Sequence, residues 1–319
     1  MARHYRHLTY KERCQIEILK TSGDSPAKIA GALGVHRSTI VREIRRNSTN
    51  QSYDSQQAQK KTQNRRHRFS VRKMSIGMIA TIEEKLRLNW SPVQISGWLK
   101  RRGKEHVSYE TIYKHIWADK KRGGFLYKCL RHNGKKYNKR SRDTSGRGCI
   151  PGRVDIKERP LIVEEKARLG DWELDTIIGA KHRGAIVSMV DRASKFTHLV
   201  KVPNKTAEEV EKALIKKLGP KQEFVHTLTS DNGKEFSSHQ NVSAALEADF
   251  FFATPYHSWE RGLNEHTNGL VRQYFPKKAS FDDISEEDVE KVEALLNKRP
   301  RKVLEFETPL EAFNRLAAE

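Results

Sequence analysis

The sequence has few cysteines and no long apolar run. Its three cysteines among 319 residues are odd in number and widely spaced, at Cys14, Cys129 and Cys149, which argues against a disulfide framework. No run of about 18 apolar residues suggests a membrane-spanning helix. The N-terminal MARHYRHLTY is basic but is not followed by the apolar segment of a signal peptide. We therefore expect a cytoplasmic, soluble protein with no membrane partner.

Acidic residues are scarce in the first half of the chain. Residues 1–150 contain 35 Lys and Arg against 11 Asp and Glu, whereas residues 151–319 contain 26 against 29. A field of this sign attracts a polyanion, and each neutralised phosphate releases counterions, so nucleic acid is the expected partner. A ribosomal or membrane-surface role is the alternative that charge alone leaves open. With only 36% hydrophobic residues, the chain is expected to form several domains rather than one large core.

Three helices are predicted near the N-terminus. Thr9 and Glu12 form a capping box for a helix that continues to about Lys20. Ser25-Pro26 starts a second helix, which Gly34 ends, and a third spans residues 36–46. This arrangement is typical of a helix-turn-helix. The DNA-contacting candidates on the third helix are Arg37, Ser38, Arg42, Arg45 and Arg46.

The same pattern recurs about 66 residues later and predicts a second helix-turn-helix. Ser91-Pro92 starts a helix that carries Ile95 and Leu99, and residues 107–116 resemble residues 35–44. The DNA-contacting candidates of this module are Arg101, Arg102 and Thr111, with Ser108 and Glu110 as weaker ones. Small helical bundles whose surface arginines merely face solvent remain the alternative for both modules.

Composition sets the predicted domain boundaries. The expected order is a first helix-turn-helix domain at 1–50, a basic linker at 51–72, a second helix-turn-helix domain at 73–119, a basic interdomain linker at 120–159 and a catalytic domain at 160–319. The second linker is glycine-rich and lacks an apolar period. A zinc site formed by Cys129, His132 and Cys149 stays open, although a Cys-x-x-Cys pair is missing.

The C-terminal part has the pattern of a mixed α/β domain. Strands are predicted at 172–178, 185–190 and 196–202, followed by a helix at 206–218, a strand from 224 to 231, a helix at 242–248, a strand at 250–253 and a helix at 259–274. This order is that of a ribonuclease-H-like domain, with a mixed five-stranded sheet flanked by helices. The expected fold is therefore multidomain: two all-α modules, then an α/β domain.

The predicted order brings three acids together. Asp175 lies in the first strand, Asp231 ends the fourth and Glu265 lies on the last helix. Carboxylates about 4 Å apart repel by roughly 1–4 kcal/mol per pair, so the cluster makes sense with cations bound. Oxygen ligands suit Mg²⁺ or Mn²⁺, and a two-ion site promotes phosphodiester displacement. Taken singly, Asp231 before Asn-Gly can be an Asx-turn acid and Glu265 a solvated helix acid.

Several motifs together carry a family resemblance. GDWELDTIIG, TSDNGKEF, TPYHSWERGLNEHTNGLVRQYFPK, LNKRPRK and TPLEAF, with HLTYKER and HRSTIVREIRRN near the N-terminus, closely resemble the DDE transposases of bacterial insertion sequences, family thirty. The resemblance implies that Asp175, Asp231 and Glu265 bind metal and that Arg272, seven residues after the glutamate, contacts DNA. His266 departs from the asparagine expected there. Glu173 and Glu260 are competing acids, of which Glu173 is the better substitute.

The resemblance implies a metal-dependent transposase. Such an enzyme binds the terminal inverted repeats of its element, cleaves a strand and transfers the 3′-hydroxyl end to target DNA as a homodimer or higher oligomer. In a bacterial cell it would lie on the nucleoid through its DNA. A sequence-specific DNA-binding regulator with an inactive nuclease-like domain is the alternative, and an integrase or resolving nuclease is a third possibility.

Overall fold

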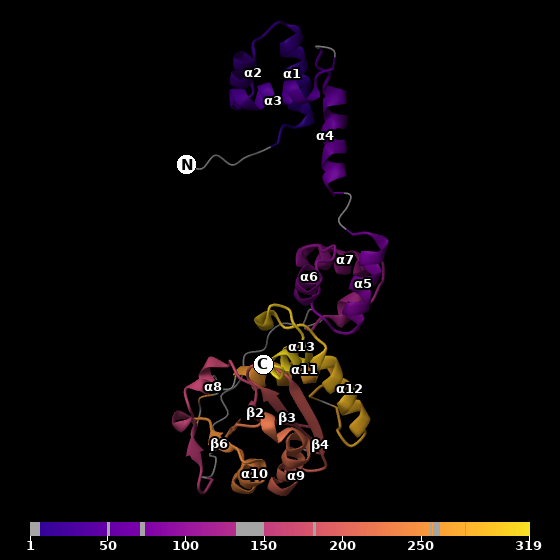
Figure 1. Cartoon of the computed structure of the whole chain (residues 1–319). Coiled ribbons are helices and arrows are strands. Elements are labelled where there is room, and N and C mark those ends of the chain that lie inside the picture. Colours follow the sequence, from indigo (N-terminus) through magenta and orange to yellow (C-terminus); the bar gives the residue numbers. More distant parts are fainter. Residues whose placement is uncertain are drawn as a thin grey trace. The chain divides into compact units, whose positions relative to one another are not determined.

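The chain forms two compact units, Met1–Ser75 and Ile76–Glu319. The structure is a computed structural model that describes residues 7–49, 52–70, 74–131, 150–180, 183–255, 257, 262–277 and 279–319. Figure 1 shows that helices α1 to α4 build the first unit and that the second combines three helices, α5 to α7, with an α/β domain.

The three helices predicted in the first unit are present. They are α1 (Tyr10–Thr21), α2 (Pro26–Ala32) and α3 (Arg37–Asn47). Thr9 and Glu12 form the predicted capping box, and the Ser25 hydroxyl accepts from the backbone of residue 28. Ile16, Ile29 and Ile40 are almost completely buried between the helices, so their apolar faces supply the core that a helix of this length requires.

The segment 51–72, predicted to be a linker, contains a fourth helix. Helix α4 (Ser55–Ser70) packs against α1 and α3 within the first unit. The buried Arg13 explains part of this packing, since its guanidinium donates to Glu43 Oε1 at 2.7 Å and to Gln59 Oε1 at 2.9 Å. A helix held mainly by polar contacts has no apolar periodicity, and for that reason the sequence indicated a linker instead.

The second group of helices starts the second unit. It comprises α5 (Ile76–Arg87), α6 (Pro92–Arg101), α7 (Tyr109–Lys121) and the 3₁₀ turn η1 (Leu126–Cys129). Ser91 and Gln94 form a capping box at α6. The predicted linker 120–159 is therefore not uniformly irregular: it includes the end of α7, η1, strand β1 (Val154–Asp155) and the turn η2 (Ile156–Glu158).

The α/β domain contains six strands rather than the predicted five. After β1 come β2 (Asp171–Ile178), β3 (Ala185–Asp191), β4 (Thr197–Val202), β5 (Thr227–Ser230) and β6 (Asp249–Phe252), in the order β1-β6-β5-β2-β3-β4. The β2, β3 and β4 strands form the predicted antiparallel meander, and β5 pairs with β2 in parallel. The extra strand has two residues and pairs only with β6. A pair of residues gives no alternation from which a strand can be predicted.

The strand before Asp231 is shorter than predicted. Phe224 ends the 3₁₀ turn η4 (Gly219–Phe224), and β5 begins only at Thr227. The apolar alternation from Phe224 onward was therefore misleading, because Pro220 near the start of η4 and packing of Phe224 on Phe313 favour a turn there. The remaining predicted strands agree with the structure to within one or two residues.

Helices cover both faces of the sheet. Helices α9 (Ala207–Leu218) and α10 (His239–Leu246) pack on one face, together with α13 (Pro309–Leu316). Helices α11 (Gly262–Tyr274) and α12 (Glu286–Asn297) pack on the other. Short elements complete the domain: α8 (Ile162–Glu165), η5 (Lys234–Phe236) and η7 (Lys302–Leu304). In β2, Trp172 and Leu174 join the α9 side and Ile177 joins the α11 side. Because strand residues alternate, Asp175 also faces α11.

Candidate functional site

The parallel pairing of β2 with β5 aligns the first two predicted carboxylates. Glu173 is paired with Thr229 in this register. Two residues further along both chains, Asp175 is level with Asp231, which directly follows the end of β5. Level residues of neighbouring parallel strands point to the same face of the sheet. Continued by two residues, this register puts Asp175 and Asp231 at matching positions on neighbouring chain segments, and their convergence with Glu265 on a metal stays a prediction.

Asp175 is half-buried, and two donors fix its carboxylate. The backbone N–H of Thr176 donates to Oδ1 at 2.9 Å, and Asn268 Nδ2 donates to Oδ2 at 2.8 Å. The Asn268 amide is held in turn, because Ser188 Oγ donates to its Oδ1 at 3.2 Å. A hydrogen bond to an ionised acceptor is about twice as strong as a neutral one, so this pair of contacts orients the carboxylate.

Asp231 begins a tight turn after β5. Its Oδ1 accepts the backbone N–H of Gly233 at 3.0 Å, which is the Asx-turn contact considered as the ordinary role of this residue. Asn232 anchors the same turn to the neighbouring strand by donating to the carbonyl of Ala253 at 2.7 Å. The turn residues therefore fix the direction of the Asp231 side chain at the edge of the sheet.

Helix α11 is attached to β2 by three side chains that repeat every four residues. Asn264 donates to the carbonyl of Leu174 at 3.0 Å, Asn268 to Asp175, and Arg272 to the carbonyl of Ile178 at 2.7 Å. Residues at i, i+4 and i+8 share one face of a helix. This contact series fixes the rotation and the height of α11 above the strand that carries Asp175.

The series gives Arg272 an internal partner, although it was predicted to contact DNA. Its guanidinium also lies over the ring of Phe281, with its central carbon 5.6 Å from the ring centroid, and burial lowers its pKa. The contact to Ile178 accounts for this position by anchoring the last turn of α11.

Glu265 lies on the first turns of α11, next to the buried Asn264, and its side chain is exposed. Within the described residues, no three Asp, Glu, His or Cys side chains lie close enough together to hold a metal ion. The competing acid Glu173 is engaged elsewhere: its Oε1 accepts from Arg192 at 2.9 Å, and both side chains are 4% exposed. Glu260 lies outside the described residues.

Glu235, on the α9 side of the sheet, is a buried acid near this site that the sequence did not single out. Its buried carboxylate accepts from Thr176 Oγ1 at 2.9 Å and pairs with Lys205 Nζ at 2.7 Å. It thereby links the segment after Asp231 to the residue after Asp175. The only sequence signal was its place in TSDNGKEF, because a buried acid and an exposed one look alike in sequence.

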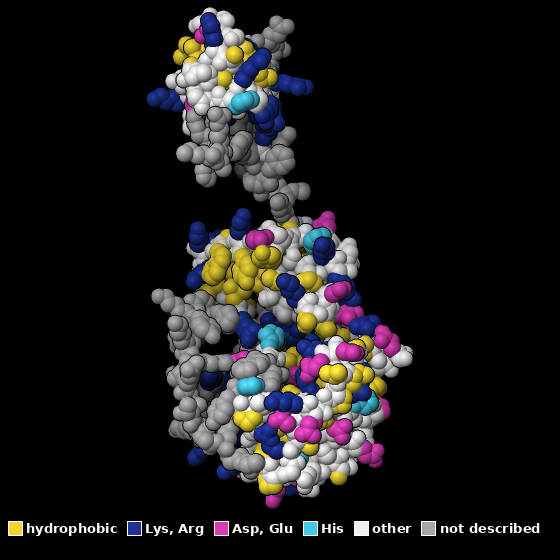
Figure 2. Space-filling model, turned by 90° about the vertical axis from the view of Figure 1, so that its left-hand side faces the viewer, with side chains coloured by type: hydrophobic (Ala, Val, Ile, Leu, Met, Phe, Trp, Pro, Cys, Tyr) yellow, Lys and Arg dark blue, Asp and Glu magenta, His cyan; other side chains and the backbone are white. Residues whose placement is uncertain are grey.

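Most predicted DNA-contacting residues of the first module lie on the surface of α3. Arg37, Arg42, Arg45 and Arg46 are exposed, and Ser38 is half-buried. Ser38 Oγ accepts from Arg42 Nη2 at 2.7 Å and lies 2.9 Å from His36 Nδ1. Figure 2 shows mainly Lys and Arg among the charged side chains on this face of the first unit, whereas the α/β domain shows both signs.

Arg101 and Arg102 of the second module pair with the C-terminal segment. Arg101 Nη2 lies 2.8 Å from Glu307 Oε1, and Arg102 pairs with Glu311. Thr111 Oγ1 is 3.2 Å from the hydroxyl of Ser108, the residue that precedes α7. The two ion pairs connect the end of α6 to the C-terminal segment of the α/β domain. They could not be predicted because their partners lie about 200 residues apart in the sequence.

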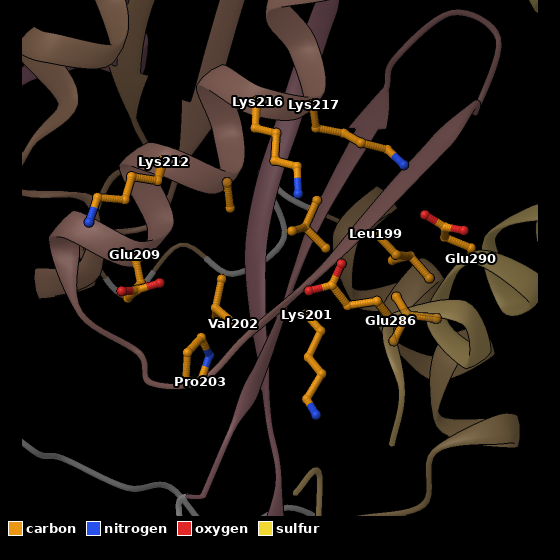
Figure 3. A pocket seen from close by; sticks show the side chains of 13 residues that line it. Leu199, Lys201, Val202, Pro203, Glu209, Lys212, Lys216, Lys217, Glu286 and Glu290 are labelled. Carbon is orange, nitrogen blue, oxygen red and sulfur yellow. The ribbon is translucent and has the colours of Figure 1, made fainter. Parts of the chain in front are cut away.

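A cavity of about 300 Å³ lies away from these carboxylates, along edge strand β4. Figure 3 shows side chains of β4, α9 and α12 around it, among them Lys201, Lys216 and Glu286. None of the three candidate acids lines it. Its mixture of lysines and glutamates gives no net charge preference, so we assign it no catalytic role.

The predicted zinc site falls only in part within the residues that the structure describes. Cys129 is half-buried and not in a disulfide, and burial raises the pKa of its thiol. His132 and Cys149, the other proposed zinc ligands, lie outside the described residues. In the described part of the chain, no helix is both long and apolar enough to cross a membrane.

Two family models match the chain. One, described as a helix-turn-helix domain, matches residues 4–47. The other, described as an integrase core domain, matches residues 165–258. The second match includes Asp175 and Asp231 and ends before Glu265.

Several curated proteins are similar over nearly the whole chain. The transposase for insertion sequence element IS4351 of Bacteroides fragilis is 45% identical, with 98% of this chain and 96% of the relative covered. The transposase for IS1086 of Cupriavidus metallidurans is 37% identical, with 98% and 96% covered. Transposase InsI for IS30A of Escherichia coli is 34% identical, with 97% and 84% covered.

Proposed function

The chain belongs to the transposases of bacterial insertion sequences related to IS30, and on that basis we propose that Asp175, Asp231 and Glu265 form its metal-dependent catalytic site. It is a DDE-type transposase with an integrase core, and it binds DNA through its helix-turn-helix domain. The observation that supports the proposed site most strongly is the register of β2 and β5, which aligns Asp175 with Asp231 beneath helix α11.

The donor set fits a hard divalent cation. Asp175 and Asp231 present carboxylate oxygens, and a carboxylate has about four lone-pair sites, so a single hydrogen bond to an oxygen leaves room for a metal. Mg²⁺ and Mn²⁺ favour such ligands. With two ions bound by Asp175, Asp231 and Glu265, the metals would activate the attacking oxygen and stabilise the leaving oxygen of a phosphodiester.

The neighbouring side chains prepare this site without reacting themselves. Asn268 and the Thr176 N–H orient Asp175, and the Gly233 N–H orients Asp231. Asn264 fixes the first half of α11 through the Leu174 carbonyl, and Glu265 is the next residue along that helix. Holding reactive groups in position before substrate binds is a major source of rate enhancement in phosphoryl transfer.

The proposed DNA partners are the terminal inverted repeats of the element and a target duplex. Helix α3 is the element proposed to read base edges, through residues at its exposed surface. They are Arg37, Ser38, Arg42, Arg45 and Arg46. Because two element ends are joined to one target, we propose a homodimer or higher oligomer in the complex with DNA.

The test is a cleavage and joining assay with the purified full-length chain. A labelled duplex carrying the terminal repeat is incubated with Mg²⁺, with Mn²⁺ or with EDTA. We expect product only with metal, and a loss of at least about 100-fold for Asp231→Asn and for Glu265→Gln, because each removes a metal ligand. Glu208→Gln, a change of an exposed glutamate on α9, is the matched control and should retain wild-type activity.

Two results would contradict the assignment. Metal-dependent strand transfer by Asp231→Asn at the wild-type rate would show that this carboxylate is not a ligand. Salt-sensitive binding of the repeat with no product under any metal would instead favour a DNA-binding regulator with an inactive nuclease-like domain.

A further inference from the structure

Two arginines of the LNKRPRK motif are buried in the second unit. Arg299 and Arg301 lie between α12 and η7, and their exposed fractions are 3% and 5%. Arginine is rarely buried to this degree unless a carboxylate or another anion compensates its charge. The contacts of these two side chains therefore need an explanation.

The hydrogen-bond partners of both guanidinium groups are neutral. Arg299 donates to Gln94 Oε1 at 2.9 Å and to Gln273 Oε1 at 2.7 Å. Arg301 Nη2 donates to the carbonyl of Leu296 at 3.1 Å, and its buried Nη1 has no partner. Neither arginine forms an ion pair with any residue that the structure describes. Among the described residues, neither buried charge has a carboxylate partner, and the titratable group beside both arginines is the Tyr274 hydroxyl.

A third arginine lies beside them. Arg131, which follows η1, lies so close to α11 that a Cβ at Gly269 would collide with its guanidinium. Burial above all, together with the charge of Arg131, lowers the pKa of Arg301 to about 9 and that of Arg299 to about 10. We call Arg131, Arg299 and Arg301 the arginine cluster.

The arginine cluster adjoins the helix that carries Glu265. Helix α11 (Gly262–Tyr274) carries Glu265 in its first turns and Gly269 and Gln273 further along. Gln273 and Gly269 on the same helix contact Arg299 and Arg131. On the face shown in Figure 2, basic and histidine side chains are visible where the second group of helices adjoins the α/β domain.

We propose that the arginine cluster is a binding site for a backbone phosphate of the DNA strand held at the active site. The proposal rests on the proposed strand-transfer function and names one protein group that would hold the substrate. A phosphodiester supplies the missing negative charge and accepts hydrogen bonds from several guanidinium groups at once. Arg131 is the exposed member that solvent reaches, and the buried Nη1 of Arg301 has no hydrogen-bond partner among the described residues.

The first test measures thermal stability with inorganic phosphate as the probe. The full-length chain is melted in sodium phosphate and in sodium chloride of equal ionic strength and pH. We expect phosphate to raise the Tm by roughly 3–6 °C at ten times its Kd. Arg301→Met should lose this increment and melt no lower than wild type in chloride, because it removes an uncompensated buried charge. Arg183→Met, which changes a side chain that is 74% exposed, should keep the increment.

A merely structural role for Arg301 gives the opposite pattern. Arg301→Met would then melt several degrees below wild type in chloride, and the phosphate increment would be absent from wild type or unchanged by the mutation. Either result overturns the proposal. If Arg301→Met does not fold, Arg131→Gln replaces it, because Arg131 is exposed and its change should leave the fold intact. Arg131→Gln should likewise lose the phosphate-induced rise in Tm.

The second test distinguishes a DNA phosphate from a free anion. A saturating terminal-repeat duplex should abolish the phosphate increment of wild type, and an increment that persists in the DNA complex would refute a DNA phosphate. In addition, single phosphates near the element end are replaced by neutral methylphosphonates. One position should slow joining by wild type about tenfold or more and leave Arg301→Met unaffected. If no methylphosphonate position has this effect, the proposal is contradicted. If the wild-type chain joins no DNA at all, the proposed function is contradicted and the melting test of the arginine cluster stays valid.

Discussion

Asn268 offers a direct test of how the helix α11 prepares the catalytic carboxylates. Its Nδ2 donates to Asp175 Oδ2 at 2.8 Å, and Asn268→Ala removes this contact while leaving every carboxylate in place. Hydrogen bonds to charged groups contribute about 1.5–3 kcal/mol. If the contact acts entirely on the reactive geometry, the loss corresponds to a rate of joining that is about 10- to 150-fold lower.

Asn264 is the matched control, since it lies one turn earlier on the same face. Its side chain is 1% exposed and donates to the Leu174 carbonyl rather than to a carboxylate. Asn264→Ala leaves a buried carbonyl unpaired at a cost of about 1–3 kcal/mol. We expect it to lower the Tm by roughly 2–10 °C. Below that temperature its half-maximal Mg²⁺ concentration should match that of wild type, because Asn264 contacts no carboxylate.

The assay is single-turnover joining of a pre-cleaved terminal repeat, measured over a range of Mg²⁺ concentrations. Asn268→Ala should need more Mg²⁺ for half-maximal rate and should melt close to wild type, whereas Asn264→Ala should show the reverse. If both variants lose stability and activity in parallel, Asn268 only supports the fold, and the positioning argument is wrong. An unchanged Mg²⁺ dependence of Asn268→Ala leads to the same conclusion.

Three further predictions concern packing, pH and DNA binding. Gly97→Ala should lower the free energy of unfolding by about 1–3 kcal/mol in denaturant titration, because its Cβ would meet the ring of Phe306. Its control is Gly77→Ala, which has open space around it. This change should be neutral or should stabilise the fold by up to about 1 kcal/mol. Burial alone would raise the pKa of Glu293, but His198, the backbone of Leu199 and Lys217 lower it below 4.5. Glu293→Gln should therefore lower the Tm at neutral pH. The difference in Tm from wild type should vanish as the pH falls below about 4.5 and then through the lower folded-state pKa. Arg42→Gln should weaken binding to the terminal repeat about 5- to 150-fold in a titration at fixed salt concentration. Arg101→Gln should change the affinity less than about twofold, since the partner of Arg101 is a glutamate. Equal effects of the two changes would show that Arg101 also contacts DNA.

Local chemistry allowed much of the fold to be predicted from the sequence. Thr9, Ser25 and Ser91 cap the helices where the pattern predicted, because a capping hydroxyl acts on backbone within three residues of itself. The meander of β2, β3 and β4 followed from alternation and short turns. The parallel pairing of β2 with β5 followed from strand order, and the register of the two strands leads on to Asp175 and Asp231.

What the sequence could not indicate were contacts whose partners lie far apart along the chain. Helix α4 was missed because polar side chains such as Arg13 hold it instead of an apolar stripe. Two-residue β1 was missed because only its pairing with β6 makes it a strand. The pairing of Arg101 with Glu307 could not be predicted because the two residues are more than 200 positions apart in the sequence.

The sequence by itself determined the family, the starts of the capped helices and the central strands. Only the tertiary structure decided which charged groups are compensated within the chain. It pairs Arg101 with Glu307, anchors Arg272 to β2 and, among the described residues, gives the buried Arg301 no carboxylate partner. The reason is physical: capping and alternation act over a few residues, whereas the environment of a charge depends on every element that packs around it.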